Sequence, residues 1–292
     1  MQEIQRSESA LETARDGEDT RQMLTIYPDL ANRYLNQGDA HQALTYINEG
    51  IDLCEKTGNK IIQARLLGLK GMALRQIGNP KQALKAYRSS QRIAEPLDHK
   101  PIWIDTLSQI GKIHAEQQEY DEAVVPLEKA YRMAYKIQNV PREMFIAGLQ
   151  GDTYQAMSQF GKAMEFYTIG LEKAQELGSK EAQCSYHIAI GKIFVEEDAP
   201  DPAYEHFKHA LDIGSRLQYA GYEFQAFENL MHLSIQQDDD DAAIKNGEQA
   251  IQLAREIEDL GAEATCVSSL SDYLIGKGDY QTASRHPDLF AA

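Results

Sequence analysis

The chain has 292 residues, of which 42% are hydrophobic and 25% are charged, and its formal net charge is −16; this composition is typical of a folded protein and excludes a disordered one. No stretch approaches the roughly 18–20 apolar residues of a membrane-spanning helix, and the N-terminus lacks the basic and apolar regions of a signal peptide. The three cysteines, Cys54, Cys184 and Cys266, lack metal-ligand spacing, and their odd number does not suit a disulfide framework, so we expect a cytoplasmic protein. Because no membrane-spanning stretch occurs, we do not expect it to bind membranes.

The first predicted element is a single helix over residues 4–15. Its Ala10 and Ala14 continue the register of helices further along the chain, so residues 1–20 are expected to form half of a helical hairpin. This half is either a natural cap or the cut edge of a longer protein, and both interpretations stay open. Apolar periodicity then predicts helices in the order 24–37, 40–57, 61–77, 80–97, 101–117, 120–138, 141–157, 160–177, 181–197, 200–217, 221–236, 240–258 and 261–277.

The pattern behind these helices repeats every 40 residues. An alanine recurs in register at Ala43, Ala83, Ala123, Ala163, Ala203, Ala243 and Ala283. Small residues precede it by twelve positions at Ala31, Gly71, Gly111, Gly151 and Gly191, although Met231 and Ser271 break this series. Bulky residues follow it by four positions at Ile47, Tyr87, Leu127, Tyr167 and Phe207. Small residues let two helices approach closely, and the bulky ones fill the space between neighbouring hairpins.

Short turns such as GDAHQA and GNPKQA separate the helices of a hairpin, and their Gly, Asn or Asp residues are expected to end one helix and cap the next. Pro80, Pro101 and Pro141 fall in first turns, where proline is tolerated. Pro126 lies in the second turn of its helix, where it removes a hydrogen bond, so we expect a local kink there.

The C-terminal end is predicted to be incomplete. A second helix of the last unit would start at Asp279 and meet Pro287, which would stop it early, so the helix 261–277 is expected to close the stack. The predicted organisation is a partial unit at 1–20, a solenoid at 21–278 and a tail at 279–292. Within the solenoid, the predicted units are 21–58, 59–98, 99–138, 139–178, 179–218, 219–258 and a capping helix at 259–278.

This arrangement of small, aromatic and alanine positions resembles the tetratricopeptide repeat, in a 40-residue form similar to the GoLoco-binding polarity adaptors and bacterial signalling proteins. The resemblance implies an all-α fold, a right-handed α-solenoid of about six to seven helical hairpins. It also implies that the first helix of each unit lines a concave groove. The inward positions of the family correspond here to Asn32, Asn36, Arg65, Met72, Arg75, Lys112, Phe145, Asp152, Gln155, Lys192 and His232.

Such a groove of polar residues with Met72 and Phe145 can bind an extended peptide, but any solvated helix face has a similar composition. Family members that grip a C-terminal carboxylate use a lysine and asparagine clamp. Asn32 and Lys112 match two positions of this clamp, whereas Met72 and Gly68 depart from it.

Catalytic and metal-binding patterns are weak throughout. No phosphate-binding loop, hydrolase motif or zinc-protease motif occurs, so no enzyme activity and no cofactor are expected. His206, His209 and Asp212 share one helix face, which is common without a metal. His114 and His187 occupy packing columns. The run Asp238–Asp241 lacks the spacing of a calcium loop and is better explained as a helix cap.

Charge is divided unevenly: residues 1–140 hold 18 Lys+Arg and 19 Asp+Glu, whereas residues 141–292 hold 11 and 26. The acidic half disfavours nucleic acid, and it either keeps the surface soluble or attracts a basic partner. The leading hypothesis is a scaffold that binds a protein or peptide in its groove. The alternatives are a sensory module of a larger signalling protein, such as a transcription regulator, cyclase or peptide receptor, and a homo-oligomer assembled through unfinished ends.

Overall fold

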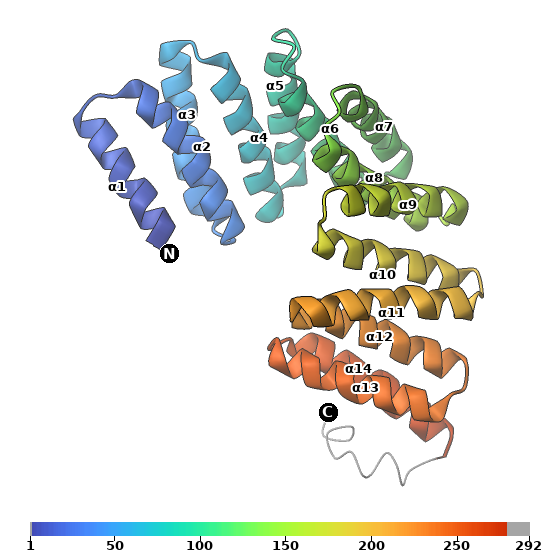
Figure 1. Cartoon of the computed structure of the whole chain (residues 1–292). Helices are drawn as coiled ribbons and strands as arrows, with labels where there is room; N and C mark the ends of the chain where they lie inside the picture. Colours follow the sequence, from blue (N-terminus) through green and yellow to red (C-terminus); the bar gives the residue numbers. More distant parts are fainter. Residues whose placement is uncertain (1, 279–292) are drawn as a thin grey trace. The chain divides into compact units, whose positions relative to one another are not determined.

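A computed structural model describes residues 2–278, which form fourteen α-helices and no strand (Figure 1). The chain divides into two compact units, Met1–Met157 and Ser158–Ala292. The predicted tail at 279–292, with its stop at Pro287, lies outside the described residues. The all-α solenoid predicted from the repeat is therefore confirmed for the part of the chain that the structure describes.

Each unit is a series of antiparallel helices joined by short turns. The first unit contains α1 (Gln2–Asp16), α2 (Thr20–Asn36), α3 (Ala40–Thr57), α4 (Lys60–Gln76), α5 (Pro80–Ala94), α6 (Lys100–Glu116), α7 (Tyr120–Lys136) and α8 (Val140–Ala156). The second unit contains α9 (Phe160–Glu176), α10 (Lys180–Glu196), α11 (Pro200–Leu217), α12 (Ala220–Gln236), α13 (Asp240–Glu256) and α14 (Leu260–Gly276).

The predicted helices agree closely with these bounds, and two differences have local causes. Helix α2 begins four residues earlier than predicted, because Asp19 caps it by accepting a hydrogen bond from the Gln22 amide at 2.9 Å. Helix α5 ends at Ala94 instead of 97, because Pro96 has no N–H group to continue the hydrogen-bond ladder.

The turns combine a left-handed residue with a helix cap, as the sequence predicted. Gly38 adopts φ +81°, and the next amide, that of Asp39, donates to the Tyr34 carbonyl at 3.0 Å. The Asp39 carboxylate then accepts from the Gln42 amide at 3.0 Å and starts α3. One three-residue turn, residues 37–39, therefore ends a helix and begins the next.

The alanine and bulky columns form the contact between paired helices. The described members of the alanine series, from Ala43 to Ala243, are completely buried, and Ala283 lies outside the described residues. Tyr87 and Phe207 from the bulky column are 1% and 0% exposed. Tyr87 packs so closely on Gly71 that a Cβ atom there would lie 2.6 Å from its ring. The small residue is therefore a steric requirement of the hairpin.

Two prolines lie inside helices without ending them. Helix α7 continues through Pro126, where the sequence predicted a kink, and α2 continues through Pro28. Each proline removes one amide donor from its helix. Packing of the remaining helix face against neighbouring helices holds the segment in place.

The even-numbered helices also contact one another directly. In the first unit α2 packs against α4, α4 against α6, and α6 against α8, while in the second unit α10 packs against α12. The first helices of successive hairpins therefore form one continuous face within each unit. In the first unit this face carries a cavity.

Candidate peptide-binding cavity

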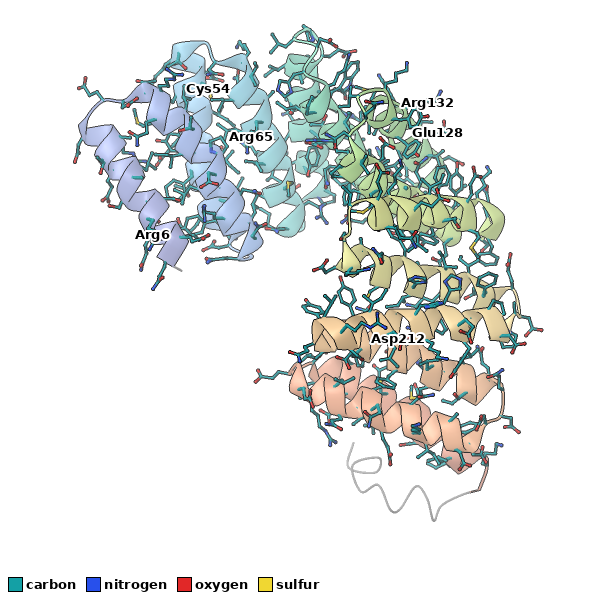
Figure 2. All side chains as sticks on the ribbon, viewed as in Figure 1. Arg6, Cys54, Arg65, Glu128, Arg132 and Asp212 are labelled. Atoms are coloured by element: carbon teal, nitrogen blue, oxygen red, sulfur yellow. The ribbon has the colours of Figure 1, made fainter. Side chains whose placement is uncertain are left out.

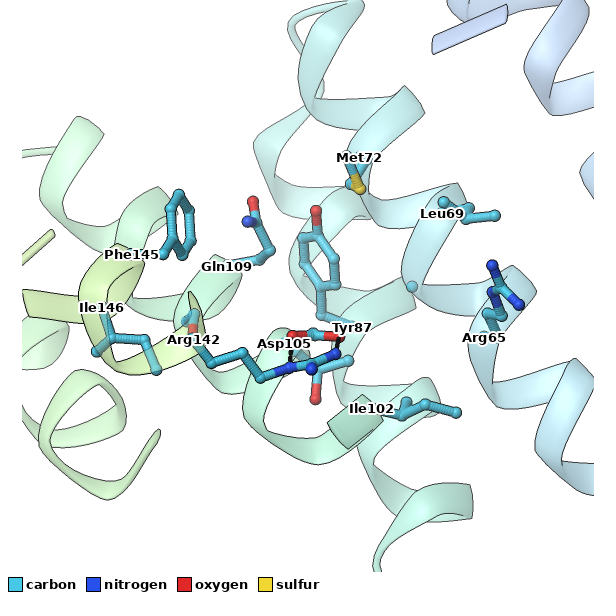
Figure 3. Close-up of a pocket in the computed structure, with 13 residues that line it drawn as sticks. Arg65, Leu69, Met72, Tyr87, Ile102, Asp105, Gln109, Arg142, Phe145 and Ile146 are labelled. Atoms are coloured by element: carbon cyan, nitrogen blue, oxygen red, sulfur yellow. Dashed lines mark hydrogen bonds and ion pairs between the residues drawn. The ribbon is translucent and has the colours of Figure 1, made fainter. Parts of the chain in front are cut away.

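A cavity of about 230 Å³ opens on the face formed by α4, α6 and α8 (Figure 3). It is lined by Arg65, Gly68, Leu69 and Met72 of α4, Tyr87 of α5, Ile102, Asp105, Thr106, Ser108 and Gln109 of α6, and Arg142, Phe145 and Ile146 of α8. Figure 3 shows Arg65 and Phe145 on opposite sides, with Tyr87 and Asp105 between them. All of these residues belong to the first unit.

The cavity exists because a small side chain and long ones alternate along its walls. Gly68 leaves a gap in α4, since a Cβ atom there would meet only the Ser90 hydroxyl at 3.8 Å. Leu69 and Met72 form an apolar wall on the same helix, and Phe145 on α8 faces the cavity with 45% of its surface exposed. An exposed aromatic ring on a concave face is a typical anchor for a partner.

Two arginines near the cavity are held by carboxylates. Arg142 forms a bidentate pair with Asp105, with Nε to Oδ1 and Nη2 to Oδ2 both at 2.7 Å. The hydrogen bonds to Asp105 raise the pKa of Arg142, so the pair stays charged and links α8 to α6. Arg75 Nη1 lies 2.9 Å from Glu116 Oε1 and links α4 to α6 in the same way.

Arg65 differs from these two because it makes no ion pair with any described residue. It is exposed at the rim of the cavity and leaves one positive charge unneutralised there. The buried Tyr87 hydroxyl also finds no hydrogen-bond partner within residues 2–278. Burial raises the pKa of Tyr87, so this hydroxyl stays protonated, but at 1% exposure the side chain is closed to a partner. The cavity therefore offers apolar walls and one cation.

The residues predicted from the repeat register are distributed over several places. Arg65, Met72 and Phe145 are brought together by the cavity. Asn32 and Asn36 line a separate open hollow at α1 and α2. The remaining predicted positions are Arg75 on α4, Lys112 on α6, Asp152 and Gln155 on α8, Lys192 on α10 and His232 on α12.

Sequence reasoning did not predict Arg142 and Ile102 as cavity residues. Both lie nine positions before the small residue of their units, Gly151 and Gly111. This is about one helical turn before the first inward position of the family register, which lies six residues before the small residue. Extending the inward stripe by three residues would have found them, because residues three apart share a helix face. The pairing of Arg142 with Asp105 depends on the distance between two helices and has no signal in either helix alone.

Three histidines of the second unit, His187, His206 and His209, lie close together. Its Nδ1 lies 3.1 Å from Nδ1 of His206, and the rings of His206 and His209 each lie 5.2 Å from its ring. Burial, together with these two neighbours, lowers the pKa of His187 to about 4. Residues 2–278 hold no group of three or more His, Cys, Asp or Glu residues arranged to hold a metal ion.

The aspartate run at the start of α13 acts as a cap and an ion-pair acceptor. Asp239 accepts from the Ala242 amide at 3.1 Å, as the sequence predicted. Asp238 and Asp240 bind the Lys277 ammonium at 2.6 and 3.0 Å. These contacts account for the run through residues of the chain itself.

Comparison with known families decides what this fold is. A family model described as tetratricopeptide repeat matches residues 19–96 and again residues 62–136. The chain carries tetratricopeptide repeats over residues 19–136. Repeats of this kind are protein-interaction modules, and the match indicates no catalytic family. No curated protein sequence matches the chain at a significant level.

Solved structures show the same fold over most of this chain. A signal-transduction ATPase with numerous domains and a tetratricopeptide repeat sensor, from Pyrococcus horikoshii, is similar with a TM-score of 0.78 and 16% identity, over 93% of this chain and 43% of that one. RapI in its apo form is similar with a TM-score of 0.67 and 14% identity, over 97% of this chain and 87% of that one. BtubC (BKLC) from P. vanneervenii is similar with a TM-score of 0.62 and 19% identity, over 70% of this chain and 87% of that one. None of the helices within the described ranges is long and apolar enough to cross a membrane.

Proposed function

We propose that this protein is a non-enzymatic scaffold that binds a protein or peptide segment in the cavity between α4, α6 and α8. The observation that supports this most is the cavity itself, where an exposed Phe145 and an unpaired Arg65 face each other across apolar walls. Folding does not require an exposed aromatic ring or an unpaired cation at this place. A partner would use both.

The chemistry of the cavity limits the partner. Its volume of about 230 Å³ lies below the roughly 300–1,000 Å³ typical of small-molecule sites, so it suits one or two side chains of a peptide. An aliphatic or aromatic side chain would pack against Met72 and Phe145. A carboxylate nearby would pair with Arg65. The proposed partner is therefore a segment with an apolar anchor next to an acidic residue.

Selection from a random peptide library displayed on phage tests this proposal. We expect enriched peptides to combine an apolar anchor with Asp or Glu, and to bind the Phe145→Glu and Arg65→Glu variants at least about tenfold more weakly in fluorescence anisotropy, because each change removes one contact class. Both positions are exposed, so the helices should fold normally. Circular dichroism checks this.

The matched control is Tyr135→Glu on α7. This position carries an aromatic side chain that is 64% exposed in the same unit, but it does not line the cavity. Its affinity for the selected peptides should equal that of the wild type. Selected peptides that bind Phe145→Glu and Tyr135→Glu equally well would show that the cavity is not the site.

A second candidate is a sensory or regulatory module of a larger signalling protein. It is supported by the similarity to the signal-transduction ATPase that has a tetratricopeptide repeat sensor, because this chain covers only 43% of that protein. Reading the open reading frame on both sides of residues 1–292 tests it, because an adjoining output domain would be visible there. Cytoplasmic location, association of copies through the chain ends and attraction of a basic partner to the acidic half remain predictions.

A further inference from the structure

The hairpin of α4 and α5 has an unusual charge. Residues 56–94 contain nine Lys and Arg residues and no Asp or Glu, although the chain as a whole carries 45 acidic residues and a net charge of −16. One of these nine cations, Arg65, lines the cavity, and the other eight do not. The outer helix α5 contains four of the nine cations.

These four cations form a single stripe. Lys81, Lys85, Arg88 and Arg92 follow one another at intervals of four, three and four residues, which places them on one face of the helix. All four are exposed, and with Leu84 and Ser89 they line an open hollow of about 490 Å³. At a rise of about 1.5 Å per residue the stripe is about 17 Å long. The apolar face of α5 points the other way, into the hairpin.

The stripe is not neutralised within the chain. None of its four side chains forms an ion pair with a carboxylate in the described part of the protein. The neighbouring outer helix α7 behaves differently, since Arg132 pairs there with Glu128 at 2.7 Å (Figure 2). Cations spaced three and four residues apart on one helix repel each other by a few tenths of a kcal/mol per pair.

The fold does not require positive charge at these positions. The 40-residue register places Asp121, Val125, Glu128 and Arg132 at the equivalent positions of α7. In the other outer helices the equivalents are His41, Thr45, Asn48 and Asp52; Gly161, Glu165, Thr168 and Glu172; Asp201, Glu205, Lys208 and Asp212; and Asp241, Lys245, Glu248 and Gln252. Helix α5 alone among these described helices has four cations there.

We infer that the outward stripe of α5 is a docking site for an acidic protein segment, separate from the cavity. Carboxylates spaced three and four residues apart on an α-helix recur about every 5–6 Å, which matches the spacing of the cations along α5. Such a segment would lie along α5 and pair with Lys81, Lys85, Arg88 and Arg92. Its binding would weaken with salt, because all four cations are exposed.

Three other anionic occupants fit the structure less well. A long nucleic acid would be repelled by the rest of the chain, which carries all 45 acidic residues. A membrane surface requires an outward apolar face, and the apolar face of α5 is buried in the hairpin. A second copy has an acidic half, but two chains with a net charge of −16 repel each other.

The test uses the full chain and two fluorescein-labelled peptides of identical composition. One places four Glu residues at intervals of four, three and four in an Ala- and Gln-rich helix, and the other distributes them around the helix. We expect the first peptide to bind at least about fivefold more tightly in anisotropy titrations, and its affinity to fall as salt rises from 50 to 300 mM. Equal affinity of the two peptides would overturn the inference, because the stripe would then recognise charge without spacing.

Charge reversal localises the binding. The double variant Lys85→Glu and Arg88→Glu should bind the first peptide at least about tenfold more weakly than the wild type. The control double variant Arg21→Glu and Lys136→Glu changes the net charge equally at exposed positions away from the stripe, and its affinity for the first peptide should equal that of the wild type. Equal loss in both double variants would overturn the inference. Phe145→Glu should also leave this affinity unchanged, so failure of the cavity proposal is distinguishable from failure of this one.

Competing occupants are tested in parallel. A 12-nucleotide single-stranded DNA and vesicles of phosphatidylserine and phosphatidylcholine are titrated against the wild type and the Lys85→Glu and Arg88→Glu double variant. If the DNA or the vesicles bind more tightly than the acidic peptide, and the double variant loses that binding, then that class of partner would replace the proposed one. Self-association in light scattering at 50 mM salt that the double variant abolishes would instead identify a second copy as the occupant.

Discussion

Replacing Gly111 by alanine adds one methyl group at the closest approach of α6 and α7. A Cβ atom there would lie 2.6 Å from Leu127 Cγ and 3.0 Å from the Ala123 carbonyl oxygen. Leu127 is completely buried and the carbonyl belongs to the backbone, so neither moves without displacing the hairpin. Overpacking of this kind costs about 1–3 kcal/mol, and the better helix propensity of alanine offsets about 1 kcal/mol of it. We expect a net loss of up to about 2 kcal/mol of unfolding free energy.

Gly68 provides the matched control because it lies in the middle of α4 but has open space beside it. Its nearest atom to an added Cβ is the Ser90 hydroxyl at 3.8 Å, an ordinary contact. Alanine there should gain the helix propensity without the clash. We expect Gly68→Ala to raise the unfolding free energy by about 0.5–1 kcal/mol. The same substitution is therefore predicted to change stability in opposite directions in two helices that contact each other.

Urea unfolding followed by circular dichroism and by Trp103 fluorescence measures both effects. Trp103 is the single tryptophan of the chain and lies in α6, so its emission reports the helix that carries Gly111. This local signal matters because repeat proteins can unfold in parts, and agreement of both signals would support two-state analysis. A Gly111→Ala midpoint equal to or above that of the wild type, at unchanged denaturant dependence, would refute the steric argument.

Two further predictions concern buried groups. The pKa of His187 is lowered to about 4, below the roughly 6.5 of an unfolded histidine. Its contribution to stability should therefore be complete above about pH 6.5 and be lost as pH falls toward 4. In urea unfolding at several pH values, His187→Leu should reduce this loss of unfolding free energy by about 1–2 kcal/mol, and an unchanged pH profile would contradict the prediction. Cys54, Cys184 and Cys266 are completely buried, and burial raises their pKa values to about 11, 11 and 12. Ellman's reagent at pH 8 should therefore label them slowly in the native protein and rapidly in denaturant, and fast native labelling would contradict the burial.

The site was predictable only as a set of positions on helix faces. Arg65, Met72 and Phe145 were predicted from the register and do line one cavity. Arg142 was not, because its role arises from a bidentate contact with Asp105 across 37 residues of sequence. Asn32 and Asn36 lie in a different hollow from the cavity residues, which a register cannot distinguish.

The sequence by itself determined the helices, their pairing and the residues between them. Turn residues such as Asp39 and small residues such as Gly71 act through local geometry that repeats along the chain, so their pattern is sufficient to predict them. Only the tertiary structure decided which side chains meet across helices that are distant in sequence. Those contacts depend on distances of a few ångströms between helices, as for Arg142 with Asp105 and for His187 with His206. The unpaired state of the α5 stripe was decided in the same way, because the absence of an ion pair is a property of the surroundings of the helix and not of its spacing.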